Sequence, residues 1–200
     1  TLQYEPVIKP KFASLDAASK AEKLADKINA FIKADDKGAQ LVKRSLAGLF
    51  AYVSNRVPEI SDTLYAIDDA LRGGFAWQIG PFEYWDIVGI EKGIELAKAD
   101  GLTIGTWVTD MIAAGNTSFY KTENGVKKYY DQASKSYKAI PGADAFIILD
   151  NLRNNKPVWK NSGGILHDIG DDVVCLEFTS KMNSLGGDVL QAINKSIEIA

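Results

Sequence analysis

The chain has almost none of the residues on which thiol and metal chemistry depends. Its 200 residues include one cysteine, Cys175, and one histidine, His167. A single cysteine excludes a disulfide within the chain, and with no signal peptide in view this favours a reducing cytoplasm. A zinc site needs further cysteine or histidine ligands, which the sequence does not supply. We therefore predict a cytoplasmic protein without a metal site.

Signatures of nucleotide, nucleic-acid and membrane binding are missing as well. The glycine pairs at residues 163–164 and 186–187 belong to neither a Gly-x-Gly-x-x-Gly nor a Walker pattern. The formal net charge of -3 excludes the basic surface that is typical of nucleic-acid-binding proteins. No apolar run is long enough to span a bilayer. The predicted partners are therefore small molecules or other proteins.

Hydrophobic residues are plentiful, at 46% of the chain, and are enough for a sizeable core. The chain starts at Thr1, has no methionine before Met111, and ends in a helical pattern without a stop signal. We therefore expect a part of a longer polypeptide, made of one domain or of a domain plus a fragment of another.

Most of the first 115 residues show the apolar spacing of amphipathic helices. Asp35-Asp36, Pro58 and Gly115 mark helix ends. The predicted helices cover residues 14–34, 37–55, 61–72, 81–88, 90–99 and 103–114.

Residues 73–89, which we call the corner, mix glycines, aromatics and a proline. Ser61 is predicted to cap the helix before the corner, and Gly73-Gly74 to end it. Gly80-Pro81 starts the next helix, because proline at a first helical position loses no hydrogen bond, and Glu83 suits the positive helix N-terminus. Four aromatic side chains are predicted to lie in the core or an interface rather than in a ligand groove. They are Trp77, Phe82, Tyr84 and Trp85.

The pattern changes after residue 118. Residues 119–130 predict a β-hairpin with its turn at Asn124-Gly125, and residues 143–153 predict a helix. Residues 154–157 break that helix, and there we place a domain boundary. Residues 158–160, 164–169 and 173–178 predict strands, with a turn at residues 170–172, and a helix follows from Gly187.

The titratable residues form no recognisable catalytic set. His167 lies within a predicted strand and is better interpreted as structural, and Cys175 lies in an apolar strand where a thiol is normally buried and inert. The aspartate pairs at residues 35–36, 68–69 and 171–172 are neighbours that do not face one another. We predict solvated caps and turns there, rather than acid/base or Mg²⁺ positions.

The order of residues around the corner resembles the C-terminal helical domain of 3-hydroxyacyl-CoA dehydrogenases. That family has an Asp-x-Ala, a glycine with an aromatic, and then Gly-Pro-Phe followed by an aspartate and a glycine. The matching residues here are Asp68, Ala70, Gly74-Phe75, Gly80-Pro81-Phe82, Asp86 and Gly89. Trp85 departs from the pattern, since many relatives have leucine there.

A second stretch, residues 169–185, resembles the junction at which some prokaryotic fusion proteins join that dehydrogenase to an enoyl-CoA hydratase. The resemblance covers almost the whole chain and implies a mainly α fold with a small β-hairpin. Residues 1–155 would be the helical dehydrogenase domain. Residues 156–200 would be the first strands and helix of a crotonase-like hydratase domain.

The resemblance implies fatty-acid β-oxidation, with hydration of a 2-enoyl-CoA and NAD-dependent oxidation of the 3-hydroxyacyl-CoA. The catalytic residues and the NAD-binding glycines of that family would lie outside these 200 residues. No catalytic or cofactor-binding residue is therefore assigned, and the chain alone is expected to be inactive. Its partners would be the adjacent NAD-binding and hydratase domains and, through the full-length enzyme, acyl-CoA substrates.

One substrate contact is implied by the resemblance. Asn183-Ser184-Leu185 matches the Asn-Ala-Leu turn that lies beside the CoA site in hydratases, with serine in place of alanine. Lys181 is close enough in sequence to meet a CoA phosphate. Lys181, Asn183 and Ser184 are the expected CoA-binding residues, and a simple helix cap is the alternative interpretation.

Two other hypotheses concern partners. The chain could be a stand-alone helical protein-interaction module that binds through a surface formed by Trp77 and Trp85. Residues 158–178 would also expose strand edges, which predicts pairing with the helical domain or with a second copy in a homo-oligomer.

Overall fold

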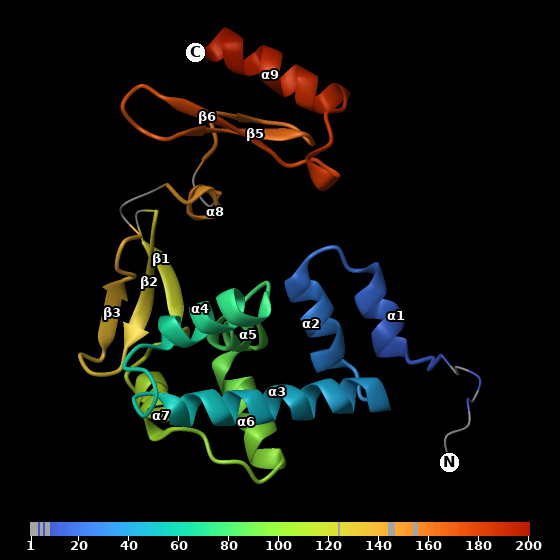
Figure 1. The fold of residues 1–200 in the computed structure, drawn as a ribbon, viewed down its shortest axis with the longest axis vertical. Helices are drawn as coiled ribbons and strands as arrows, with labels where there is room; N and C mark the ends of the chain where they lie inside the picture. The colour runs from blue at the N-terminus through green and yellow to red at the C-terminus, as the bar shows by residue number, and fades with distance from the viewer. Residues whose placement is uncertain (1–3, 5, 7–8, 124, 144–146, 154–155) are drawn as a thin grey trace. The chain divides into compact units, whose positions relative to one another are not determined.

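Helices dominate the structure, which confirms the predicted mainly α class (Figure 1). The computed structural model describes residues 4, 6, 9–123, 125–143, 147–153 and 156–200. The chain forms two compact units, one made of Thr1–Lys121 and Tyr129–Lys138 and the other of Thr122–Lys128 and Ala139–Ala200. Within the described ranges, no helix is both long enough and apolar enough to cross a membrane.

Two helices occupy the first segment, for which the apolar spacing predicts one. Helix α1 covers Ala13–Lys20 and α2 covers Leu24–Lys33, with extended backbone at Ala21. The Asp36 carboxylate accepts hydrogen bonds from the backbone N–H of Ser14 at 2.8 Å and of Ala39 at 2.9 Å. It therefore holds together the first turns of α1 and of α3 (Lys37–Arg56), and the chain must turn back between them.

Helices α3, α5 (Pro81–Val88) and α6 (Ile90–Ala99) confirm the predicted ranges, and α7 (Thr106–Ala113) starts later than predicted. Helix α4 (Leu64–Phe75) corrects the prediction at both ends. Ser61 is not its cap, because its hydroxyl bonds to the backbone of Thr63 outside the helix. Gly73-Gly74 do not end it, since exposed glycines cost a helix only about 1 kcal/mol each. The helix instead ends at Phe75, because the next residue, Ala76, has a left-handed φ of 54°.

The core of the first unit is built from aromatic rings. Phe50 of α3 stacks on Trp85 of α5, with centroids 4.7 Å apart and ring planes within 8°. Phe119 lies against Phe82 at 5.0 Å and against Trp107 at 5.8 Å. Phe82 and Trp85 are fully buried, which confirms their predicted place in the core.

The predicted hairpin is part of a three-stranded sheet. Strands β1 (Tyr120–Glu123), β2 (Val126–Asp131) and β3 (Ser136–Ala139) pair in that order. Strand β3 was not predicted, because it is short and mostly exposed and lacks an alternating apolar pattern. Gly125 has the expected positive φ of 76°, and Asn124 lies outside the described residues.

The predicted helix at residues 143–153 is largely absent from the residues described there. Only α8 (Leu149–Leu152) is helical, and residues 144–146 lie outside the described ranges.

The second unit confirms its predicted strands and its last helix. Strands β4 (Trp159–Lys160), β5 (Gly164–Asp168) and β6 (Val174–Phe178) form an antiparallel sheet in which β5 is central. Helix α9 (Gly187–Ile199) packs on one face of this sheet (Figure 1). A Cβ atom on Gly164 would lie 3.1 Å from the Ala192 Cβ atom, so glycine allows this close approach. The assignment of residues 156–200 to a crotonase-like domain stays a prediction.

Candidate functional site

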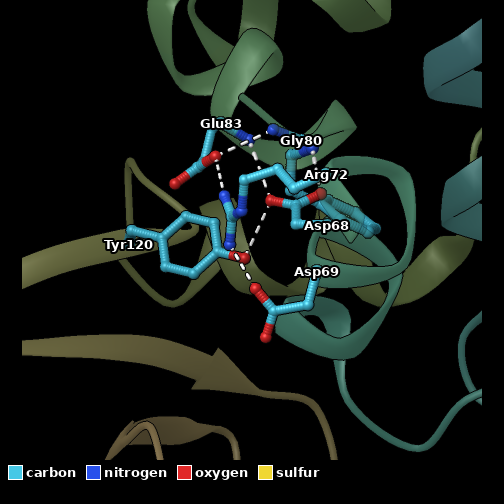
Figure 2. Close-up of polar contacts among 7 residues, drawn as sticks. Asp68, Asp69, Arg72, Gly80, Glu83 and Tyr120 are labelled. Atoms are coloured by element: carbon cyan, nitrogen blue, oxygen red, sulfur yellow. Dashed lines mark hydrogen bonds and ion pairs between the residues drawn. The ribbon is translucent and has the colours of Figure 1, made fainter. Parts of the chain in front are cut away.

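The corner is organised around one buried carboxyl group, that of Asp68 on α4 (Figure 2). Asp68 has 0% exposed surface. Its Oδ1 atom accepts a hydrogen bond from the Phe82 backbone N–H at 2.9 Å, and its Oδ2 atom accepts from the Glu83 N–H at 3.3 Å. The Tyr120 hydroxyl donates to Oδ2 at 2.8 Å. Asp68 therefore caps α5 and ties it to β1.

This position corrects the prediction that Asp68 and Asp69 are both solvated. Asp68 follows Leu64 by one helical turn on the face of α4 that is buried. Asp69 lies one residue further round the helix, and its side chain is 56% exposed. A pair of adjacent aspartates thus has one structural and one solvated member.

A second acidic residue, Glu83, binds a free backbone N–H group at the start of α5. Its Oε2 atom accepts a hydrogen bond from the Gly80 N–H at 2.8 Å, which confirms its predicted role in the first turn. The guanidinium of Arg72 pairs with both Glu83 and Asp69 (Figure 2). We call Asp68, Arg72, Glu83 and Tyr120 the corner cluster.

Burial dominates the acid–base properties of Asp68 and Tyr120. Burial raises the pKa of Asp68 to about 7, although the hydrogen bonds from the Phe82 amide and the Tyr120 hydroxyl lower it and the Glu83 charge raises it further. Burial also raises the pKa of Tyr120 well above its ordinary value, with a further contribution from Asp68. Tyr120 is therefore a neutral hydrogen-bond donor throughout the physiological range of pH.

Glycine is required at position 80 because a side chain there would collide with Asp68, and not because of the backbone angles. A Cβ atom at this position would lie 2.2 Å from both the Cβ and the Cγ atom of Asp68. The backbone φ of -85° is open to any residue. The Gly-Pro-Phe element of the motif thus has a steric explanation.

Asp86 on α5 holds the base of the hairpin from the other side. Its two carboxylate oxygens accept hydrogen bonds from the backbone N–H of Phe119 at 2.7 Å and of Tyr120 at 2.9 Å. The two motif aspartates thus share one partner, Tyr120, which Asp68 binds through the hydroxyl and Asp86 through the backbone N–H.

Two corner aromatics that are not fully buried, Trp77 and Tyr84, lie beside an apolar hollow. Trp77 and Tyr84 approach each other edge to face at 6.0 Å and form one wall. The hollow has a volume of about 620 Å³, and its other lining residues come from α3. They are Leu41, Val42, Ser45, Leu46 and Leu49. The hypothesis of a binding surface formed by Trp77 and Trp85 is wrong, because Trp85 is fully buried.

The three expected CoA-binding residues lie close together in the second unit. Lys181–Asn183 form a single 3₁₀ turn, and the Ser184 hydroxyl bonds to the Lys181 carbonyl oxygen at 2.9 Å. Lys181 and Ser184 line a hollow of about 490 Å³ at the N-terminus of α9, whereas Asn183 is not part of its lining. Asp188, in the first turn of α9, lines the same hollow and bonds to the Ser162 hydroxyl.

His167 has the structural role that its strand position predicts. It is buried, and its Nε2 atom lies 2.9 Å from Glu177 Oε2. Arg153 pairs with the same carboxylate, and its hydrogen bond is the main cause that lowers the pKa of Glu177. Cys175, opposite His167 in the sheet, is half-buried rather than buried as predicted, because β6 is an outer strand. Within the described ranges, no three histidine, cysteine or carboxylate side chains are placed to hold a metal ion.

No protein-family model matches the chain, and no solved structure matches it. Three curated proteins do. Two are putative fatty acid oxidation complex trifunctional enzymes, from Rickettsia prowazekii (strain Madrid E) and Rickettsia felis (strain ATCC VR-1525 / URRWXCal2). They are 23% and 25% identical to it, over 86% and 92% of this chain and 21% and 22% of their own lengths.

The third relative is a probable 3-hydroxyacyl-CoA dehydrogenase from Bacillus subtilis (strain 168). It is 38% identical over 199 residues, which make up 99% of this chain and 25% of that protein. The chain therefore spans about a quarter or less of the length of the curated relatives it matches. These similarities confirm the resemblance carried by the corner: nearly the whole chain is similar to a segment of this probable 3-hydroxyacyl-CoA dehydrogenase.

Proposed function

We propose that the chain is a non-catalytic part of a fatty-acid β-oxidation enzyme that oxidises 3-hydroxyacyl-CoA with NAD. The identity of 38% over 99% of the chain to a protein with that dehydrogenase name carries the proposal. A supporting role also fits the corner, since its titratable group Asp68 is buried and bound to three structural donors. The NAD site and the reacting groups would belong to adjacent domains.

Assays of the full-length polypeptide test this proposal. With NAD and 3-hydroxybutyryl-CoA, we expect it to form NADH. The variant G80A, which displaces Asp68, should lower this activity, whereas G73A should leave it unchanged because nothing lies within 4 Å of a Cβ atom there. A well-folded full-length protein that forms no NADH would overturn the proposal.

We further propose that residues 156–200 begin a crotonase-like hydratase domain and that Lys181, Asn183 and Ser184 contact CoA. The hollow beside Lys181 and Ser184 at the N-terminus of α9 supports the proposal, because helix N-termini and ammonium groups both attract phosphate. Asp188 in the same hollow opposes an anion. Lys181 would therefore supply most of the attraction.

Calorimetric titration of CoA into the full-length protein tests the contact. K181A should weaken binding by roughly tenfold, the value of one charge-assisted hydrogen bond. K195A is the matched control, because Lys195 lies on α9 outside this hollow and pairs with Glu198 at 2.7 Å. If K181A and K195A bound CoA with equal affinity, Lys181 would not be a CoA-binding residue.

A further inference from the structure

The corner cluster joins the helices to the base of the hairpin through a single buried carboxyl group. Tyr120 is the first residue of β1, and its hydroxyl reaches Asp68 across 52 positions of sequence. The chain passes from the first compact unit to the second directly after Lys121. A change at Asp68 therefore reaches Tyr120 at the start of β1.

The groups that face Asp68 come from three elements. Arg72 lies on α4, Glu83 lies on α5, and Tyr120 lies on β1 (Figure 2). Asp69, also on α4, pairs with Arg72 and does not face Asp68. Three carboxyl groups, those of Asp68, Asp69 and Glu83, are thus close to the Arg72 guanidinium. Among carboxyl groups this close, the one that is most buried is the one whose charge is least favourable.

The contact between Asp68 and Tyr120 can persist when Asp68 is protonated. A carboxylic acid donates through its O–H, and a tyrosine hydroxyl can accept as well as donate, so the two groups can exchange roles. Protonation thus keeps the hydrogen bond and removes the buried charge. Ionisation keeps the hydrogen bond but places a charge where water cannot reach it.

We propose that Asp68 and Tyr120 form a pH-sensitive latch at the base of the hairpin, closed when Asp68 is protonated and opened more readily when Asp68 is ionised. In the open state, Tyr120 leaves the carboxylate and water solvates it. The pKa of about 7 in the closed state and the ordinary value of 3.8 in water set the range in which this happens. Linkage then requires the opening equilibrium constant to rise as the pH increases through this range and to level off above about pH 7.

Hydrogen exchange of the Phe119 and Tyr120 amides, measured on the whole chain, tests the latch. Both amides are bonded to Asp86 and exchange when the base of the hairpin opens. After division by the intrinsic rate, the opening constant should rise at least tenfold between about pH 5 and about pH 8. D68N should abolish this rise. D69N should retain it, since Asp69 is the exposed neighbour on the same helix.

The second measurement is a titration of the Asp68 carboxyl group followed by carbon-13 NMR. It does not depend on D68N, so it tests the latch even if that variant fails to fold. In the unmodified chain the resonance should titrate near pH 7. In Y120F the midpoint should move upward, because one donor to the carboxylate is lost. A pH-independent opening constant, a rise that persists in D68N, or an Asp68 resonance that titrates below about pH 5 would each overturn the latch.

Discussion

Gly80 and Asp68 are so close that a Cβ atom on Gly80 would lie 2.2 Å from the Asp68 side chain. We expect G80A to lower the free energy of unfolding by about 2 kcal/mol or more, because the carboxyl group must leave its donors on α5. G73A is the matched control and should raise stability by about 0.5 kcal/mol, since alanine favours a helix over glycine. Urea unfolding of the two variants measures both effects, and equal stabilities would contradict the steric explanation.

Trp85 is packed against Gly93 as closely as Asp68 is against Gly80. A Cβ atom on Gly93 would lie 2.0 Å from Trp85 Nε1, which donates to the Ile90 carbonyl oxygen at 3.0 Å. W85L should cost about 3 kcal/mol through the lost stacking on Phe50. G93A should also be destabilising, but less so in the W85L background, where the leucine leaves room. A double-mutant cycle by urea unfolding should therefore show coupling of at least about 1 kcal/mol, and strict additivity would show that the indole does not restrict position 93.

Asp86 should anchor the base of the hairpin through backbone groups, whereas Asp68 holds it through the Tyr120 hydroxyl. D86A leaves the amides of Phe119 and Tyr120 without their carboxylate acceptor, and we expect a loss of about 2 kcal/mol. D86N keeps one acceptor oxygen and should lose less. Hydrogen exchange at these two amides provides the local measurement, and protection that is unchanged in D86A would show that the anchor lies elsewhere.

Glu177 should make the second unit sensitive to acid. Its pKa is lowered, chiefly by the hydrogen bond from Arg153 and also by that from His167. A lowered folded-state pKa contributes stability that is present above the ordinary value of 4.5 and is lost as the pH falls through the folded-state value. The Tm should therefore fall less between about pH 6 and about pH 3 in E177Q than in the unmodified chain. E198Q, which removes an exposed carboxylate on α9, is the control, and its Tm should fall with pH as in the unmodified chain. An equal fall of the Tm in E177Q and E198Q would contradict this role of Glu177.

The sequence predicts best those elements whose signals are local. Gly80-Pro81 and Glu83 place the start of α5 correctly, because the cap, the proline and the first-turn acid all lie within four residues. The strands β5 and β6 follow in the same way from their apolar runs and the turn between them. Where a boundary depends on a distant partner, the prediction is wrong. Asp36, which joins the first turn of α1 to that of α3, lies beyond both α1 and α2.

The buried carboxyl group of the corner could not be predicted from the sequence for the same reason, because its partners are distant in the chain. Asp68 has the sequence neighbours of a solvated helical residue, and only its contacts with Phe82 and with Tyr120 explain its burial. The apolar spacing of Leu64, Ile67 and Leu71 could have indicated that position 68 lies on the inner face of α4, but a carboxyl group there is unusual without its partners. The family resemblance identified the motif residues, and the structure supplies their physical roles.

Turnover by the isolated 200-residue chain tests most directly whether it supports catalysis without performing it. The chain is mixed with NAD and 3-hydroxybutyryl-CoA, and the absorbance of NADH is followed, with the full-length polypeptide as the positive control. We predict no NADH from the chain alone and NADH from the full-length protein. NADH formation by the isolated chain would contradict the account, because the catalytic groups would then lie within these residues.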